Sequence, residues 1–275
     1  MAEASPSFLV RKPFEQGYMD VIEPGFAGLK QLSLGVLTLA EGMEYASTTG
    51  HKEAGLVALG GRCRVEAGDA VFPEVGDRSD VFSGKAHAVY LPPRTAFQVT
   101  ALTGMQAALC WCAAGADTPG VGRPGAPMLV GPPAVRVKPV GRGNWSRTVY
   151  DVFHENVNAQ HLVLGETMNP PGNWSSAPPH KHDVHDPPHE VEMEEIYLFK
   201  VQPSQGFGIQ RLYDDRTFDV AYTIQDGDAV AIAEGYHPVV AGPGYRLYYL
   251  WFLAGRGREL YPNTDPKHAW LLKET

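Results

Sequence analysis

Two histidines separated by one residue are the clearest chemical feature of the sequence. His180 and His182 flank Lys181 directly after a pair of prolines. In a β-strand, side chains two residues apart face the same side, so both imidazoles would project together while Lys181 points away. Two imidazoles at this spacing can bind one divalent metal ion. The spacing therefore predicts a metal site in this part of the chain.

Two later segments are expected to complete the ligand set. Glu195 begins the strand-like stretch Glu-Ile-Tyr-Leu-Phe, whose neighbouring strand could carry the two histidines, and His237 follows an apolar run at 227–232. Three imidazoles and one carboxylate would hold one divalent ion (Zn, Mn or Fe) and leave positions open to a substrate. Glu190 and Glu194 are alternative carboxylate ligands.

The elements that must position these residues are predicted to be β-strands. Gly and Pro are abundant, with 30 and 23 residues, and apolar runs rich in β-branched and aromatic residues alternate with turn signals. Few segments keep a helical period. The expected strands lie at 32–38, 55–59, 97–102, 161–165, 195–199, 207–212, 229–232 and 245–252. This pattern predicts an all-β fold of sandwiches or barrels.

A repeated tetrapeptide indicates two related β units. The sequence Gly-Asp-Ala-Val occurs at 68–71 and at 227–230, each time after a strand-like run and before an apolar strand and a Pro-rich stretch. The segment 113–139 between the units is rich in Gly and Pro and is predicted to be a linker. We therefore expect two domains, at 1–130 and 131–275.

Composition and charge exclude several classes of partner. The formal net charge is −8 and no long basic run is present, which argues against nucleic acid. No apolar run has the length of a signal-peptide core or a membrane span, so no membrane partner is expected. The three cysteines are odd in number and lack zinc-ribbon spacing, as expected of reduced thiols. These features predict a cytoplasmic protein.

The ligand pattern resembles the cupin signature of His-x-His, a strand-borne Glu and a later His. More narrowly, the chain resembles the 5-deoxy-glucuronate isomerases of myo-inositol catabolism. The resemblance rests on PPHKHD at 178–183, MEEIYLF at 193–199, GFGIQRLY at 206–213, GDAVAIAEGYHPV at 227–239, GYRLYYLW at 244–251, DPKHAW at 265–270 and SGKAHAVYLPP at 83–93. It covers most of the chain.

The resemblance implies two tandem cupin (jelly-roll) β-barrels, with one divalent metal ion in the C-terminal barrel. Its ligands would be His180, His182, Glu195 and His237. The first half offers only His51 and His87 as candidate ligands and no His-x-His, so no metal is expected there. The implied reaction is the aldose–ketose isomerisation of 5-deoxy-D-glucuronate to 5-dehydro-2-deoxy-D-gluconate through an enediolate. A metal ion would stabilise the enediolate charge as a Lewis acid.

Several side chains are candidates for proton transfer and for substrate binding. Glu194, Tyr236 and His185, together with His189 or a metal-bound hydroxide, are candidate bases. Glu194 would face away from Glu195 on a shared strand. The substrate carboxylate requires a cation, for which Arg211 is the first candidate and Lys181 and Arg246 follow. The strand tyrosines Tyr197, Tyr248 and Tyr249 could line the barrel.

Three other functions share the same ligand pattern. An isomerase of a 4-deoxy-5-keto-uronate would use nearly identical chemistry, and an Fe(II) cupin dioxygenase suits the same donors. A cupin that binds sugar without turnover is the third. The expected partner is a small sugar acid in each isomerase case. A homodimer is one assembly that exposed edge strands would allow.

Overall fold

The chain folds almost entirely into β-strands in the computed structural model, which describes residues 7–114 and 124–273. The all-β prediction is confirmed. Helical segments in these residues are short 3₁₀ turns: η1 (Phe26–Gly28), η2 (Pro132–Ala134), η3 (Gly143–Trp145) and η4 (Ala269–Leu272). None of the helices in the described ranges is long and apolar enough to cross a membrane.

The first barrel consists of two sheets that enclose an apolar interior. Its six-stranded sheet has the order β11 (Met128–Val130), β8 (Ala88–Leu91), β5 (Lys52–Gly60), β10 (Met105–Ala113), β3 (Leu32–Leu39) and β2 (Gly17–Ile22). Its four-stranded sheet has the order β4 (Glu44–Thr48), β9 (Ala96–Ala101), β6 (Cys63–Ala67) and β7 (Ala70–Val75). Buried side chains of both sheets, such as Leu56 and Val65, pack in the interior.

The second barrel repeats this plan. Its larger sheet has the order β1 (Leu9–Val10), β20 (Ala229–Ile232), β17 (Met193–Gln202), β22 (Arg246–Gly255), β14 (Val163–Asn169), β13 (Arg147–Phe153) and β12 (Arg136–Val140). Its smaller sheet has the order β15 (Trp174–Ser175), β21 (Val239–Ala241), β18 (Gly208–Tyr213) and β19 (Asp219–Ile224). A further pair joins β16 (His180–Lys181) to β23 (Asn263–Thr264).

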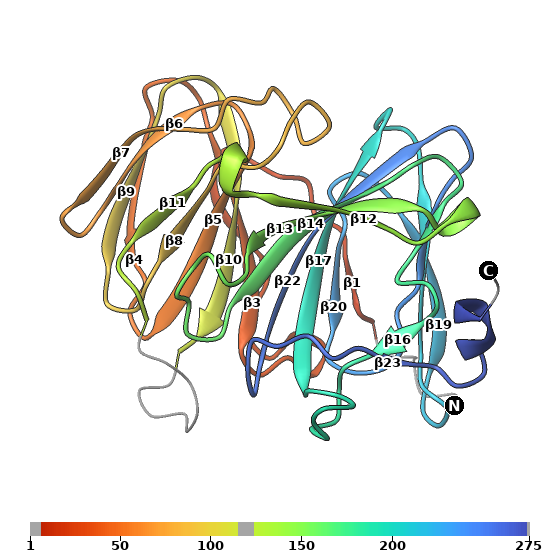
Figure 1. Cartoon of the computed structure of the whole chain (residues 1–275). Helices are drawn as coiled ribbons and strands as arrows, with labels where there is room; N and C mark the ends of the chain where they lie inside the picture. The colour runs from red at the N-terminus through yellow and green to blue at the C-terminus, as the bar shows by residue number, and fades with distance from the viewer. Residues whose placement is uncertain (1–6, 115–123, 274–275) are drawn as a thin grey trace, which may run out of the picture.

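The two barrels share one strand order. The order β8-β5-β10-β3-β2 matches β20-β17-β22-β14-β13, and β4-β9-β6-β7 matches β15-β21-β18-β19. The register also matches, because β2 carries a bulge between Asp20 and Ile22 where β13 carries one between Asp151 and Phe153. The predicted tandem barrels are confirmed, and they lie side by side (Figure 1).

The tetrapeptide repeat does not mark matching positions in the barrels. The first copy lies at the turn between β6 and β7, whereas the second lies at the turn between β19 and β20. Since β7 corresponds to β19, the two copies are one strand apart in the shared topology. The two units are related, and the evidence for this is their matching strand order and not the tetrapeptide.

Part of the predicted linker is structured. Residues 115–123 lie outside the described ranges, but β11 adds an edge strand to the first barrel and β12 adds one to the second. The chain therefore passes between barrels after β11. The N-terminal strand β1 pairs with β20, so residues 9–10 belong to the sheet of the second barrel.

Buried carboxylates hold the barrels together in a reciprocal manner. Glu53 at the start of β5 accepts hydrogen bonds from the backbone N–H groups of 160–162, which precede β14. Glu194 at the start of β17 accepts hydrogen bonds from the N–H groups of 30–32, which lead into β3. The two glutamates occupy matching positions, since Glu53 pairs with Cys112 on β10 as Glu194 pairs with Ala254 on β22. We call these two sets of contacts the carboxylate clasp.

A buried ion pair and a shared core add to the clasp. Arg78 of the first barrel binds Glu166 on β14 through two hydrogen bonds, of 2.6 and 3.1 Å, and the Tyr248 hydroxyl donates to the same carboxylate. An apolar cluster joins the facing larger sheets, with Leu34 and Tyr90 from one barrel against Phe252 from the other. The interface therefore combines specific buried polar contacts with apolar packing, unlike a loose contact between domains.

We expect Glu194→Ala to lower the free energy of unfolding by about 3 kcal/mol or more, because three backbone N–H groups would lose their acceptor in a buried interface. Urea unfolding of the purified protein measures this. Glu192→Ala is the matched control, since the Glu192 carboxylate is partly exposed and forms ion pairs with the exposed side chains of Lys30 and Arg256. Equal unfolding midpoints for the two variants would show that the clasp does not hold the barrels.

Candidate metal centre

Glu195 faces the interior of the second barrel because it follows Glu194 on a strand. Side chains alternate along β17, so Ile196 and Leu198 join Glu194 on the face toward the first barrel. Tyr197 and Phe199 share the other face with Glu195 and pack inside the barrel. One strand thus supplies a carboxylate to each of two environments. The expectation that the His-x-His strand neighbours β17 is wrong, because β17 pairs with β20 and β22.

The His-x-His segment is held across the barrel mouth by its own short pairing. β16 pairs with β23 and ends before His182, whose Nδ1 lies 2.8 Å from the Met193 carbonyl oxygen. This contact sets the orientation of the ring and directs Nε2 toward Glu195, with Oε2 3.2 Å away. The strand-like spacing places both histidines toward the interior, as the sequence predicts.

His237 enters the same space from the loop between β20 and β21. Its side chain is fully buried, and its Nδ1 lies 3.0 Å from the Gly235 carbonyl oxygen. Its Nε2 lies 3.4 Å from Glu195 Oε2 and has no hydrogen-bond partner. The ring centroid of His237 lies 5.1 Å from that of His182 and 4.8 Å from that of His180.

This arrangement brings three possible metal ligands together. The ligand atoms of His182, Glu195 and His237 all lie within 4.8 Å of one another. His182 Nε2 lies within hydrogen-bond distance of Glu195, whereas a proton on His237 Nδ1, donated to the Gly235 carbonyl, leaves the His237 Nε2 lone pair facing the same carboxylate. Two acceptors in contact are unfavourable unless a cation lies between them. The group could therefore hold a metal ion, and the unpartnered Nε2 of His237 fits that function.

The pKa shifts of the three histidines follow from burial and from Glu195. Burial lowers the pKa of both His180 and His237 to about 3, and neighbouring imidazoles add to the effect. For His182, burial also favours the neutral ring, but the hydrogen bond to Glu195 and its charge outweigh this and raise the pKa. Neutral His180 and His237 keep their lone pairs available as ligands at neutral pH.

Lys181 anchors the histidine segment instead of facing the interior. Its ammonium group contacts the Asp183 carboxylate and lies 3.0 Å from Glu190 Oε1. Glu190 also accepts the backbone N–H groups of Asp183 and Val184 and the Asn263 amide. These contacts use the Glu190 carboxylate outside the cluster, which argues against it as an alternative ligand.

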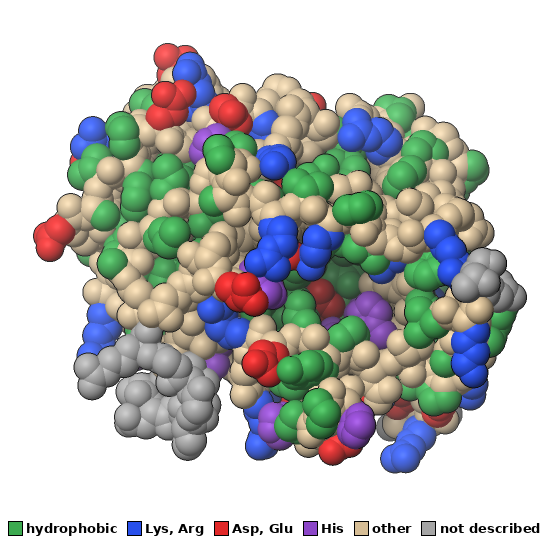
Figure 2. Space-filling view, viewed as in Figure 1, with side chains coloured by type: hydrophobic (Ala, Val, Ile, Leu, Met, Phe, Trp, Pro, Cys, Tyr) green, Lys and Arg blue, Asp and Glu red, His purple; other side chains and the backbone are tan. Residues whose placement is uncertain are grey.

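The ligand cluster opens into a cavity of about 150 Å³. Histidine side chains are visible at a hollow on the half of the molecule formed by the second barrel (Figure 2). Polar groups in the wall are Arg147, Thr167, Ser175 and Ser176, together with the hydroxyls of Tyr197 and Tyr249. The apolar wall includes Trp251 and Leu260. A cavity of this kind can enclose a small polar molecule against a metal ion.

The structure does not bring the proposed bases to this cavity. Glu194 faces the first barrel within the carboxylate clasp, as strand alternation dictates. His185 is exposed in the loop after His182, as is His189. Tyr236 stacks on Tyr213 with ring centroids 5.1 Å apart and does not line the cavity.

The proposed substrate cations also lie elsewhere. Arg211 is half-exposed on β18, where its Nε and Nη2 each donate to Asp219 at 2.8 Å. Arg246 donates to Gln202 and covers the Phe82 ring at the junction of the barrels. Tyr248 points toward the first barrel and binds Glu166. Each of these side chains has a structural partner outside the cavity.

Arg147 is the cation that the sequence analysis did not identify. It begins β13 and lines the cavity, but a single Arg in the stretch Asn-Trp-Ser-Arg-Thr carries no motif. β13 pairs with its neighbour β14, and the pairing of β14 with β22, from a distant position in the chain, brings Arg147 there. The hydroxyls of Ser175 and Thr167 were missed for the same reason.

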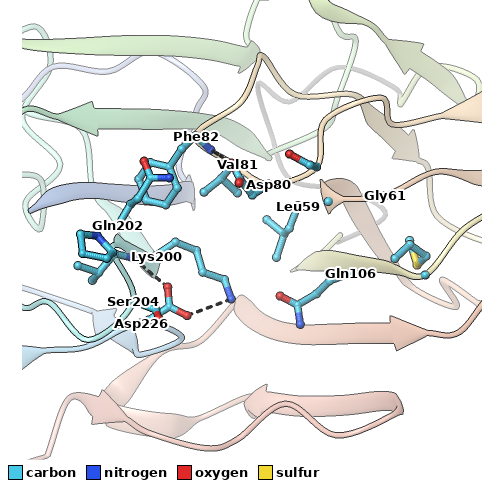
Figure 3. Close-up of a pocket in the computed structure, with 16 residues that line it drawn as sticks. Leu59, Gly61, Asp80, Val81, Phe82, Gln106, Lys200, Gln202, Ser204 and Asp226 are labelled. Carbon is cyan, nitrogen blue, oxygen red and sulfur yellow. Dashed lines mark hydrogen bonds and ion pairs between the residues drawn. The ribbon is translucent and has the colours of Figure 1, made fainter.

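A larger cavity of about 610 Å³ lies at the junction of the barrels and is separate from the ligand cluster. Asp80 and Phe82 of the first barrel face Lys200 and Asp226 of the second across it (Figure 3). Lys200 Nζ lies 3.7 Å from Asp226. The cavity shares no residue with the metal centre and its wall contains no histidine.

Comparisons with known proteins agree with the fold and the site. The model of the KduI/IolB family matches residues 8–271. The 5-deoxy-glucuronate isomerase of Geobacillus thermodenitrificans is 37% identical over 263 residues, which cover 95% of this chain and 93% of the relative. The 5-deoxy-glucuronate isomerase of Bacillus subtilis strain 168 is 32% identical, with 97% of this chain and 99% of the relative covered.

Solved structures extend the comparison. The crystal structure of an IolB-like protein from Salmonella typhimurium superposes with a TM-score of 0.89 and 31% identity, covering 97% of this chain and 99% of that one. The oxalate decarboxylase of Lactobacillus farciminis has a TM-score of 0.64 at 12% identity, with 97% and 88% covered, and shares the cupin fold alone. The resemblance drawn from the sequence motifs is confirmed: this chain belongs to the KduI/IolB family.

Proposed function

We propose that the protein is a metal-dependent aldose–ketose isomerase that converts 5-deoxy-D-glucuronate to 5-dehydro-2-deoxy-D-gluconate. Two similar proteins that each match more than nine-tenths of this chain bear the name 5-deoxy-glucuronate isomerase. The observation that carries the proposal is the cluster of His182, Glu195 and His237 beside a cavity whose wall includes Arg147 and several hydroxyl groups. Such a site can hold a divalent ion beside a small sugar acid.

The proposed ligands are His180, His182, Glu195 and His237. The ligand atoms of His182, Glu195 and His237 lie within 4.8 Å of one another. The ring of His180 lies beside that of His237, with 4.8 Å between the ring centroids. Three neutral imidazoles and one carboxylate would leave a divalent ion with a net charge of about +1 and with open positions. Zn, Mn and Fe all suit these donors.

The reaction moves a proton from C2 to C1 of the sugar and places negative charge on oxygen between the two steps. A bound divalent ion supplies Lewis-acid stabilisation of that charge. The chain orients its own ligands through the carbonyls of Met193 and Gly235, which fix the two imidazoles. The geometry of the site is thus set before the substrate enters, as electrostatic preorganisation requires.

We assign Tyr197 to hydrogen bonding with the oxygen on which charge develops. It lies two residues after Glu195 on the same face of β17, and its ring centroid lies 6.0 Å from that of His237. Its hydroxyl contacts Ser176 Oγ at 3.1 Å and lines the cavity. Burial and the nearby Glu195 charge raise the pKa of Tyr197, which keeps the hydroxyl protonated and able to donate.

The ligand assignment is tested by metal content. We expect His182→Ala and Glu195→Ala to lose the bound divalent ion, because each removes a member of the cluster. Glu192→Gln is the matched control, because Glu192 is a partly exposed carboxylate near Glu195 that pairs with Lys30 and Arg256, and it should retain about one ion per chain. Mass spectrometry of purified, dialysed protein measures this. Retention of the ion by both alanine variants would exclude His182 and Glu195 as ligands.

The reaction is tested by following 5-deoxy-D-glucuronate by NMR in D₂O. Conversion should incorporate deuterium at C1, stop after chelation of the metal and resume when a divalent ion is restored. Unchanged sugar acid in the presence of fully metal-loaded protein would contradict the substrate assignment while leaving the metal centre intact. Direct transfer of hydrogen without solvent exchange would instead contradict a solvent-accessible enediolate.

The role of Tyr197 is tested by removing its hydroxyl. We expect Tyr197→Phe to lower kcat about 100-fold, since the developing charge loses a preorganised donor. Metal content should not change. Tyr236→Phe, on a tyrosine that stacks outside the cavity, should have kcat within about twofold of the unmodified protein. Equal kcat values in the two variants would remove Tyr197 from the mechanism.

A further inference from the structure

We propose that Arg147 binds the carboxylate of the sugar acid and makes the site selective for acids over neutral sugars. This inference rests on the proposed function, because it takes 5-deoxy-D-glucuronate as the substrate. It concerns the carboxylate end of that substrate and not the carbons that react. In 5-deoxy-D-glucuronate, the reacting carbons and the carboxylate lie at opposite ends of the chain. A site that holds one end at a metal ion therefore needs a cation elsewhere in the same cavity.

The side chain of Arg147 lies inside the cavity wall rather than on the surface. It is half-buried beside the rings of Tyr249 and Tyr197, and its charge contributes to the lowered pKa of His180. Space for the guanidinium depends on Gly141, where a Cβ would approach Arg147 Nη1 to 2.9 Å and the Trp145 carbonyl oxygen to 2.1 Å. The local backbone is therefore shaped around the guanidinium.

One edge of this guanidinium has no partner. Nη1 donates to the carbonyl oxygens of Trp145 and Ala177 at 3.1 and 3.4 Å. Nε is buried without an acceptor, and Nη2 makes no hydrogen bond to any described residue. The Nε–Nη2 edge is the one that Arg11 and Arg211 use to hold Asp228 and Asp219. Arg147 thus presents a complete carboxylate-binding edge with no carboxylate.

Arg78 and Arg258 have partners on all three guanidinium nitrogens, which sets Arg147 apart from them. Arg78 is paired with Glu166 through two hydrogen bonds. Arg258 has no carboxylate, but its Nε, Nη1 and Nη2 each donate to a backbone carbonyl. Arg147 has no salt bridge to any described carboxylate, and burial lowers its pKa. An anion that enters the cavity would relieve this uncompensated charge.

The first barrel lacks counterparts of both Arg147 and the Glu195 carboxylate. By the shared register, Ala54 stands where the second barrel has Glu195, and Gln16 stands where it has Arg147. The first barrel keeps the strand order but lacks both charged groups. Their joint presence in one cavity favours a common ligand with two polar ends.

The test compares binding of two probes that cannot be isomerised. One is the acid made by reducing the aldehyde of 5-deoxy-D-glucuronate to an alcohol, and the other is the polyol in which the carboxylate is reduced as well. We expect calorimetry on metal-loaded Arg147→Met to show about 100-fold weaker binding of the acid and unchanged binding of the polyol. Arg147→Lys should lie between, because it keeps charge without the planar edge.

Arg136→Met is the matched control, since Arg136 makes an exposed ion pair with Glu155 and should leave both affinities unchanged. Metal content and thermal unfolding verify that each variant is folded. Equal loss for both probes, undiminished acid binding in Arg147→Met, or no preference for the acid in the unmodified protein would each overturn the inference. Arg147-dependent acid binding without turnover would uphold it and contradict only the proposed reaction.

Discussion

Consecutive residues of one β-strand face opposite sides, and at the start of β17 this rule assigns one carboxylate to assembly and the next to chemistry. Glu194 accepts three backbone N–H groups from the first barrel. Glu195 faces the interior with His182 and His237. Because a shift of one residue would exchange the two faces, the clasp also fixes the register that presents Glu195 to the site. The candidate metal centre therefore depends on how the barrels are joined.

The same frame supports different chemistry in the two barrels. Glu53 repeats the clasp from the first barrel, but the next residue is Ala54, and apolar side chains such as Leu56 and Leu109 fill the interior. The second barrel replaces part of that packing with a carboxylate, imidazoles and an arginine. Buried polar groups of this kind destabilise a fold unless partners or ligands satisfy them. The apolar interior of the first barrel and the packed interface between the barrels offset that cost.

The remaining polar contacts around the site hold the ligands rather than react. Backbone carbonyls orient His182 and His237. The contacts of Lys181 with Asp183 and Glu190 secure the loop that follows His182. Asp183 also accepts the Gly235 N–H group at 2.7 Å, which ties the two histidine-bearing segments to each other. Residues proposed as bases or substrate cations from sequence thus include several that position the site from outside.

Sequence alone predicts the strand-rich fold, the two related units and the His-x-His, Glu and His pattern, because alternation and short spacings are local properties of a chain. It also indicated that Glu194 would face away from Glu195. It did not place the strand partners of β16 and β17, the structured part of the linker, or the role of Arg147. Those features depend on contacts between residues far apart in the chain, such as the pairing of β14 with β22 that carries β13 and Arg147 to the cavity. Such contacts also determine which charged side chains have partners, and they leave Arg147 in the cavity wall without a carboxylate partner among the described residues.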